Sequence, residues 1–141
     1  PDISLTVLTN SIKVAMELST KKQITVVSTG GTLLSKSLSY VGPLAETSLD
    51  NYHVKKAFIS CKGLHIDRGI SESHEQQARI KKKMIESADK VYIMIDHSKF
   101  GMQAFSSIGG LEIIDHIITD TTIESKTIQQ LEDKSMNLIK V

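Results

Sequence analysis

The stretch that decides the fold is Val91-Tyr92-Ile93-Met94-Ile95, which is apolar at every position. A short apolar run that ends in polar residues is typical of a strand buried on both faces of a parallel sheet. We therefore expect this strand at the centre of the sheet. A helical pattern from about His74 to Ala88 precedes it, and a further strand is predicted at His116–Thr119.

The same alternation continues towards both ends of the chain. The other predicted strands are Ile3–Leu8, Ile24–Ser28, Val54–Ser60 and Met136–Val141, and the other predicted helices are Ser11–Leu18, Pro43–Tyr52 and a segment ending at Asp133. Strands that alternate with helices predict parallel βαβ units, so the predicted class is α/β in one domain. Residues 32–41 are expected to be irregular and residues 62–72 to form a polar loop. Capping boxes are expected at Ser73/Gln76 and Thr121/Glu124.

Composition excludes several function classes. The net charge of +1 is unlike that of a nucleic-acid binder, and no apolar stretch is long enough to cross a bilayer. Cys61 is the only cysteine, so no internal disulfide can form, which fits a reducing cytoplasm. The histidines show no metal spacing, and we expect neither a metal nor a cofactor. The chain starts Pro1-Asp2 without an initiator methionine, and we expect it to be a fragment.

Candidate functional residues follow the predicted strands, because the ligand crevice of an open α/β sheet lies beyond the carboxyl ends of its strands. Lys99, in the turn Asp96–Gly101, can contribute a charge-assisted bond to an anion, and Asp96 can hold Lys99 or accept from a sugar hydroxyl. The plainer alternative is a solvated lysine in a strand-end turn. The pair Gly30-Gly31 can bring backbone N–H groups to an anion or can simply form a tight turn.

A third candidate is the corner Cys61-Lys62-Gly63 together with Glu72 and Glu75. The two carboxylates could orient hydroxyls or act as an acid–base pair, or they could only complement the positive end of the next helix. The basic run 79–83 is interpreted as a solvated helix face with intrahelical ion pairs.

Taken together, these segments resemble a known family from Leu5 to about Asp120. The residues that carry the resemblance are Thr9–Ser11, Gly30–Thr32, Lys36–Glu46, Lys56–Ile59, Gly69-Ile70 with Glu75 and Ala78, and Asp96–Gly101. The series is similar to the C-terminal sensor domain of DeoR-type bacterial transcription repressors.

The resemblance implies a Rossmann-like α/β domain, related to ribose-5-phosphate isomerase and coenzyme A transferases, with a mostly parallel sheet and helices on both faces. It implies binding of a phosphorylated sugar or similar metabolite, which alters a homo-oligomer and so releases DNA. DNA would be contacted only through an N-terminal helix-turn-helix, and residues 1–141 would be a partial sensor domain that lacks the family's first strand and phosphate loop. By matching motif, the implied effector-binding residues are Asn10, Gly31, Thr32, Lys36, Lys62, Gly63, Glu72, Glu75, Asp96 and Lys99.

Two departures from the family pattern bear on the ligand. Lys62 stands where many members carry an acidic residue, so the preferred ligand is expected to be more anionic. Leu34 replaces a basic residue that is frequent there. The alternatives are a sugar-phosphate isomerase, which would need a carboxylate base and an acid partner beside the substrate carbonyl, and an oligomerisation module without an effector.

Overall fold

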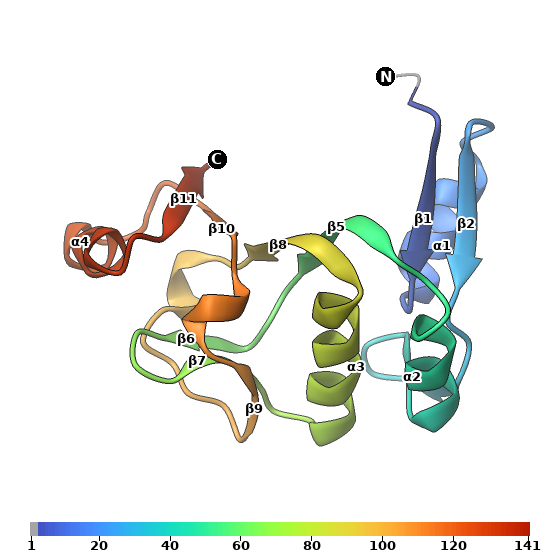
Figure 1. Ribbon diagram of the computed structural model, residues 1–141, viewed down its shortest axis with the longest axis horizontal. Helices are drawn as coiled ribbons and strands as arrows, with labels where there is room; N and C mark the ends of the chain where they lie inside the picture. The colour runs from blue at the N-terminus through green and yellow to red at the C-terminus, as the bar shows by residue number, and fades with distance from the viewer. Residues whose placement is uncertain (1–2) are drawn as a thin grey trace. The chain divides into compact units, whose positions relative to one another are not determined.

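The computed structural model describes residues 3–141, and Pro1 and Asp2 lie outside the described residues. The chain forms two compact units, one ending at Tyr52 and one running from His53 to Val141 (Figure 1). Nothing in the sequence pattern marked this boundary.

The first unit begins with a parallel βαβ arrangement. Its elements are β1 (Leu5–Thr9), α1 (Ile12–Ser19) and β2 (Ile24–Ser28), with β1 and β2 paired in parallel. Ser11 caps α1, because its hydroxyl accepts a hydrogen bond from the backbone N–H of Val14 at 3.2 Å. The predicted strands and helix are confirmed here, and β2 has the bounds that the sequence indicated.

Residues 32–41 form a hairpin rather than an irregular segment. β3 (Thr32–Leu34) pairs antiparallel with β4 (Ser39–Val41), and α2 (Pro43–Leu49) follows. The expectation of irregular structure was wrong because strands of three residues are too short to show a clear alternation of apolar and polar side chains.

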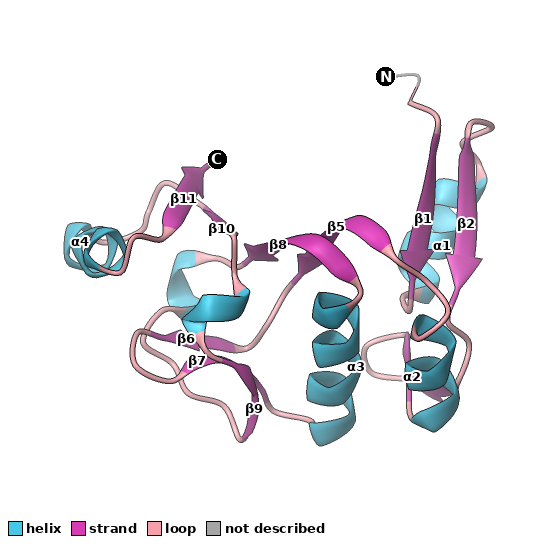
Figure 2. Ribbon diagram, viewed as in Figure 1, coloured by secondary structure: helices cyan, strands magenta, loops and turns pink. Residues whose placement is uncertain are grey.

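The second unit is built on a four-stranded, wholly parallel sheet. Its strands are β5 (Val54–Ile59), β8 (Ala88–Met94), β10 (His116–Thr119) and β11 (Asn137–Lys140), in the order β11-β10-β8-β5. The flanking helices are α3 (Glu75–Glu86) and α4 (Ser125–Asp133) (Figure 2). The α/β class with a mostly parallel sheet is confirmed, and β8 lies inside the sheet as predicted.

A small antiparallel sheet occupies part of the segment that was expected to be a polar loop. β6 (Gly63–His65), β7 (Gly69–Glu72) and β9 (Ser106–Gly109) pair in the order β6-β7-β9. The expectation of a loop at residues 62–72 was therefore wrong. The polar residues between the two short strands form only the hairpin turn. Two single 3-10 turns complete the unit, η1 (His97–Lys99) and η2 (Leu111–Ile113).

Side chains along β8 and at the residue after it alternate between buried and more exposed positions, so only one face of the strand is buried. Val91, Ile93 and Ile95 are buried in the core, whereas Tyr92 is half-buried and Met94 is 44% exposed. The buried face belongs to a core that includes Ala78 and Ile85 of α3 and Leu131 of α4. The expectation of a strand buried on both faces was thus wrong for this unit. On the other face the rings of Phe58, Tyr92 and His116 stack at 4.9 and 4.7 Å.

Both predicted capping boxes are absent. α3 has His74 and α4 has Glu124 as the residue before the first helical turn, and neither side chain makes a capping hydrogen bond. Each helix begins two to four residues after the first residue of its expected box, so the paired side chains do not reach the free N–H groups. Within residues 3–141, no helix combines the length and the apolar character needed to span a bilayer.

Candidate functional site

The turn after β8 is held by its own first residue. The carboxylate of Asp96 accepts hydrogen bonds from the hydroxyl of Ser98 and from the backbone N–H of Ser98, the latter at 2.9 Å. These hydrogen bonds, aided by nearby Lys99, hold the pKa of Asp96 below its usual value. The ammonium of Lys99 lies 3.5 Å from the Asp96 carboxylate and is about one-third exposed. Lys99 is therefore an oriented cation at the carboxyl end of an inner strand.

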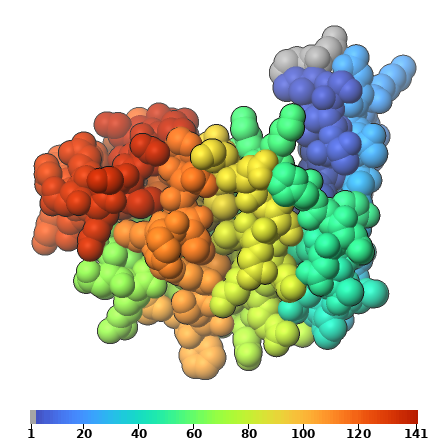
Figure 3. Space-filling view, viewed as in Figure 1, coloured from blue at the N-terminus to red at the C-terminus, as the bar shows by residue number. Residues whose placement is uncertain are grey.

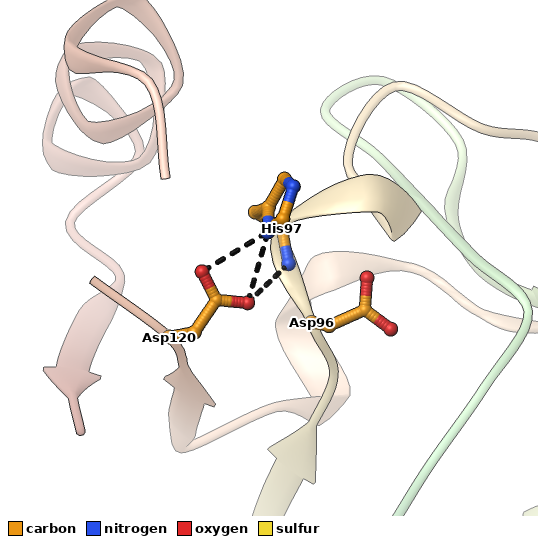
Figure 4. A group of neighbouring side chains, drawn as sticks. All are labelled: Asp96, His97 and Asp120. Atoms are coloured by element: carbon orange, nitrogen blue, oxygen red, sulfur yellow. Dashed lines mark hydrogen bonds and ion pairs between the residues drawn. The ribbon is translucent and has the colours of Figure 1, made fainter. Parts of the chain in front are cut away.

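Asp120, at the end of neighbouring β10, holds the same turn from the other side. Its carboxylate accepts the backbone N–H of His97 at 2.8 Å, and it lies 3.1 Å from Nδ1 of the His97 ring (Figure 4). The backbone N–H of Thr122 donates to it at 2.9 Å. The hydrogen bond from the His97 backbone is the main reason that the pKa of Asp120 falls to about 2. Asp120 thus stays ionised and fixes the turn that presents Lys99.

The Lys62–Gly63 corner docks against that turn. The backbone N–H of Gly101 donates to the carbonyl of Leu64 at 2.8 Å, and a side-chain carbon on Gly63 would collide with the backbone of Met102. Lys62 is exposed, and its backbone N–H donates a hydrogen bond to the carbonyl of Ser71 at 3.0 Å. The segments after β5 and β8 are therefore joined by backbone contacts, and only glycine fits where they cross.

Glu72 lies beneath this corner in a buried ion pair. Its carboxylate is 2.6 Å from the ammonium of Lys81, which also donates to the carbonyl of Ser60 at 2.7 Å. The side chains of Glu72 and Lys81 are only 5% and 16% exposed. The interpretation of residues 79–83 as a solvated face with intrahelical pairs was therefore wrong at Lys81, and also at fully buried Ile80.

The two remaining candidates of the second unit are Glu75 and Cys61. Glu75 is exposed in the first turn of α3, where a carboxylate complements the positive end of the helix. Cys61 is buried, and burial raises the pKa of its thiol to about 11. Such a thiol is a small apolar core residue rather than a nucleophile.

Four predicted residues belong to the first unit. Asn10 joins the end of β1 to β4, since its side-chain amide donates to the carbonyl of Tyr40 at 2.9 Å. Gly31 has a φ of +116°, and a side-chain carbon there would press on Ala45 and on the carbonyl of Val41. Thr32 and Lys36 are both exposed, at the start and at the turn of the β3–β4 hairpin.

One group of side chains could hold a cation by proximity alone. Within residues 3–141, a ligand atom of Asp96, one of His97 and one of Asp120 lie within 4.8 Å of one another. Figure 4 shows the Asp96 carboxylate turned away from the His97–Asp120 pair. Asp96 is paired with Lys99 and Asp120 with the backbone of the turn, so both carboxylates have partners that a metal ion would have to displace. Sequence spacing did not show this group, because Asp120 comes from another strand.

Two positioning residues escaped the sequence analysis. Asp120 was not among the candidate residues, and Lys81 was grouped with the solvated basic run. The signal for Asp120 was its place directly after β10, beside the end of β8. For Lys81 the sequence offered no signal, because its pairing with Glu72 depends on how α3 packs against β7.

Comparisons with known proteins define the class. Residues 1–121 match the family model described as the DeoR C terminal sensor domain. The chain is 51% identical over its full length to the HTH-type transcriptional regulator YulB of Bacillus subtilis. It is 38% identical over 84% of its length to the HTH-type transcriptional repressor GlcR of the same organism, and 34% identical over 87% to the L-fucose operon activator of Haemophilus influenzae.

The chain therefore belongs to the DeoR family of transcriptional regulators, as a sensor domain, and the family resemblance is confirmed. The matched family and these relatives are regulators and not enzymes, which removes the isomerase alternative. The aligned regions cover 55%, 45% and 49% of the three relatives, so the chain spans about half their length.

Proposed function

We propose that this chain is the effector-sensing part of a transcriptional regulator of sugar metabolism and binds a phosphorylated sugar or a related metabolite. Effector binding alters a homo-oligomer and releases DNA, which a helix-turn-helix segment outside this chain contacts. The regulator acts in the cytoplasm. The relatives support a role in sugar operons, since one is named for the L-fucose operon.

The observation that carries the proposal is the position of Lys99. It follows an inner strand of a parallel sheet, where α/β proteins place ligands. Asp96 and Asp120 fix its turn, and the exposed cation Lys62 stands on the corner docked to that turn. A cation held at a strand end needs little reorganisation to bind an anion such as phosphate.

The other residues have supporting parts in this proposal. Gly63 permits the close crossing of the two segments, Glu72 holds the corner through Lys81, and Glu75 and Asp96 offer carboxylates to sugar hydroxyls. Further candidate contacts in the first unit are Asn10, Gly31, Thr32 and Lys36.

The test is thermal unfolding of the chain with a panel of sugar phosphates. A ligand that binds only the folded state raises the midpoint. We expect at least one sugar phosphate to do so for the wild type and for Lys82→Met, a control at an exposed lysine of α3. Lys99→Met should weaken the same ligand roughly tenfold to a hundredfold, as expected for the loss of a charged hydrogen bond. An equal shift in Lys99→Met and the wild type would contradict the proposal.

A further inference from the structure

A hollow of about 320 Å³ opens on the second unit. Its walls come from β6 and the turn after it, from the end of the turn that carries Lys99, and from α4. The residues that line it include Leu64, Ile66, Asp67, Phe100, Thr127 and Gln130. The volume lies at the small end of the range for small-molecule pockets, roughly 300 to 1,000 Å³.

The hollow lies where neighbouring strands of one sheet end. β6 comes after β5, Phe100 comes after β8, and α4 comes after β10, and these three strands are adjacent in the sheet. The space-filling view shows the surface of α4 (red) directly against the segment around β6 and β7 (light green) (Figure 3). The carboxyl ends of adjacent parallel strands are the usual ligand position in open α/β sheets.

The lining has the chemistry of a site for an uncharged, hydroxyl-bearing molecule. Leu64, Ile66 and Phe100 provide an apolar wall for the C–H groups of such a molecule. The hydroxyl of Thr127 and the amide of Gln130 can both donate to and accept from hydroxyl groups.

The charge of the lining separates this hollow from a phosphate site. The lining holds no lysine or arginine, and its ionisable residues are Asp67 and His65, whose Nδ1 accepts a hydrogen bond from the backbone N–H of Asp67 at 3.1 Å. A phosphate placed there would meet the carboxylate of Asp67 without a lysine or arginine to compensate it. The cation of this neighbourhood is Lys99, the residue directly before Phe100.

We propose that this hollow binds the uncharged, hydroxyl-bearing part of the effector, and that Thr127 and Gln130 select which sugar is bound. The inference rests on the proposed function, because the phosphate of the same molecule is assigned to Lys99. α4 begins at Ser125, whereas the family model ends at residue 121, so sugar selection is assigned to a segment beyond the part that defines the family.

The experiment is an NMR titration of the complete 141-residue chain with backbone and side-chain amide detection. The probes are inorganic phosphate, a panel of hexose and pentose phosphates, and the unphosphorylated sugars. The variants are Gln130→Leu and, as a matched control, Gln129→Leu, since Gln129 is an exposed neighbour on α4 that donates to Asp133 at 2.9 Å and does not line the hollow.

The proposal predicts that at least one sugar phosphate shifts the signals of Lys99, Thr127 and the Gln130 side chain, while inorganic phosphate shifts Lys99 alone. Gln130→Leu should weaken that sugar phosphate roughly threefold to tenfold, the value of a neutral hydrogen bond, and leave inorganic phosphate unchanged. Gln129→Leu should change neither affinity.

Three other results are possible, and each would contradict a different part of this inference or of the proposed function. If a sugar phosphate shifts Lys99 but neither shifts Gln130 nor responds to Gln130→Leu, this inference fails and the proposed function stands. If inorganic phosphate shifts Gln130 as strongly as the sugar phosphate does, the assignment of the hollow to the uncharged part is wrong. If the whole panel leaves Lys99 unmoved, the proposed function fails, and this inference fails with it.

Discussion

The ammonium of Lys81 lies 2.6 Å from the carboxylate of Glu72, and both side chains are largely buried beneath the Lys62–Gly63 corner. Lys81 belongs to α3, Glu72 ends β7, and the same ammonium donates to the carbonyl of Ser60 just after β5. This pair therefore fixes three elements of the second unit at one point, and it determines where the corner stands.

Lys81→Met should be strongly destabilising. Removing one partner leaves the buried Glu72 carboxylate without its cation, which typically costs several kcal/mol. We expect the free energy of unfolding, measured with urea, to fall by about 3 kcal/mol. Lys82→Met, on the exposed neighbour, should stay within about 0.5 kcal/mol of the wild type. A loss below about 1 kcal/mol in Lys81→Met would show that the pair does not hold the corner.

Gly63→Ala should disturb both the corner and the turn that carries Lys99. The added carbon would collide with the backbone of Met102, which cannot move as a side-chain end can. We expect a cost of about 2 kcal/mol, together with changed amide chemical shifts from Lys99 to Met102. Gly101→Ala is the comparison, since it meets no atom within 4 Å and its φ of +80° costs only about 1 kcal/mol. Equal stability of Gly63→Ala and the wild type would mean that the two segments do not cross this closely.

Asp120 should contribute a pH-dependent part of the stability. Its pKa in the folded chain is about 2, below the ordinary value of 3.8, so the carboxylate favours the folded state. That contribution is fully present above about pH 4 and is lost as the pH falls towards about 2. The wild type should therefore have a higher melting temperature than Asp120→Asn at pH 6, and the difference should shrink steadily below pH 4. A difference that stays constant from pH 6 to pH 2 would contradict this.

Cys61 should be protected from thiol reagents in the folded chain. Burial raises its pKa to about 11, so at pH 8 only about one thiol in a thousand is ionised. Because Cys61 is the single cysteine, labelling reports on this site alone. We expect labelling in buffer to be at least about a hundredfold slower than in 8 M urea. Similar rates in the two conditions would place Cys61 at an accessible position.

The larger elements of the fold could be predicted because their sequence signals are local. The apolar run at β8 and the β-branched run at β2 each depend on a few neighbouring residues, and the structure has both strands. The short hairpins could not be predicted, because strands of three or four residues gain their stability from pairing with distant segments. The exposure of Met94 was missed because an apolar run does not reveal which face the unit covers.

The site could be predicted only in outline. Strand-end position alone pointed to the Asp96–Gly101 turn and to the Lys62–Gly63 corner, and the structure docks the two together through Gly101 and Leu64. Asp120 and Lys81 act on these segments from another strand and from a helix, and no spacing along the chain encodes such contacts. The effector contacts themselves remain predictions.

A crystal structure of the chain grown with a sugar phosphate that stabilises it would show directly where the effector binds. We expect an ordered phosphate group within hydrogen-bonding distance of Nζ of Lys99, at the carboxyl end of β8. A ligand bound away from the ends of β5, β8 and β10 would contradict the proposed role of Lys99.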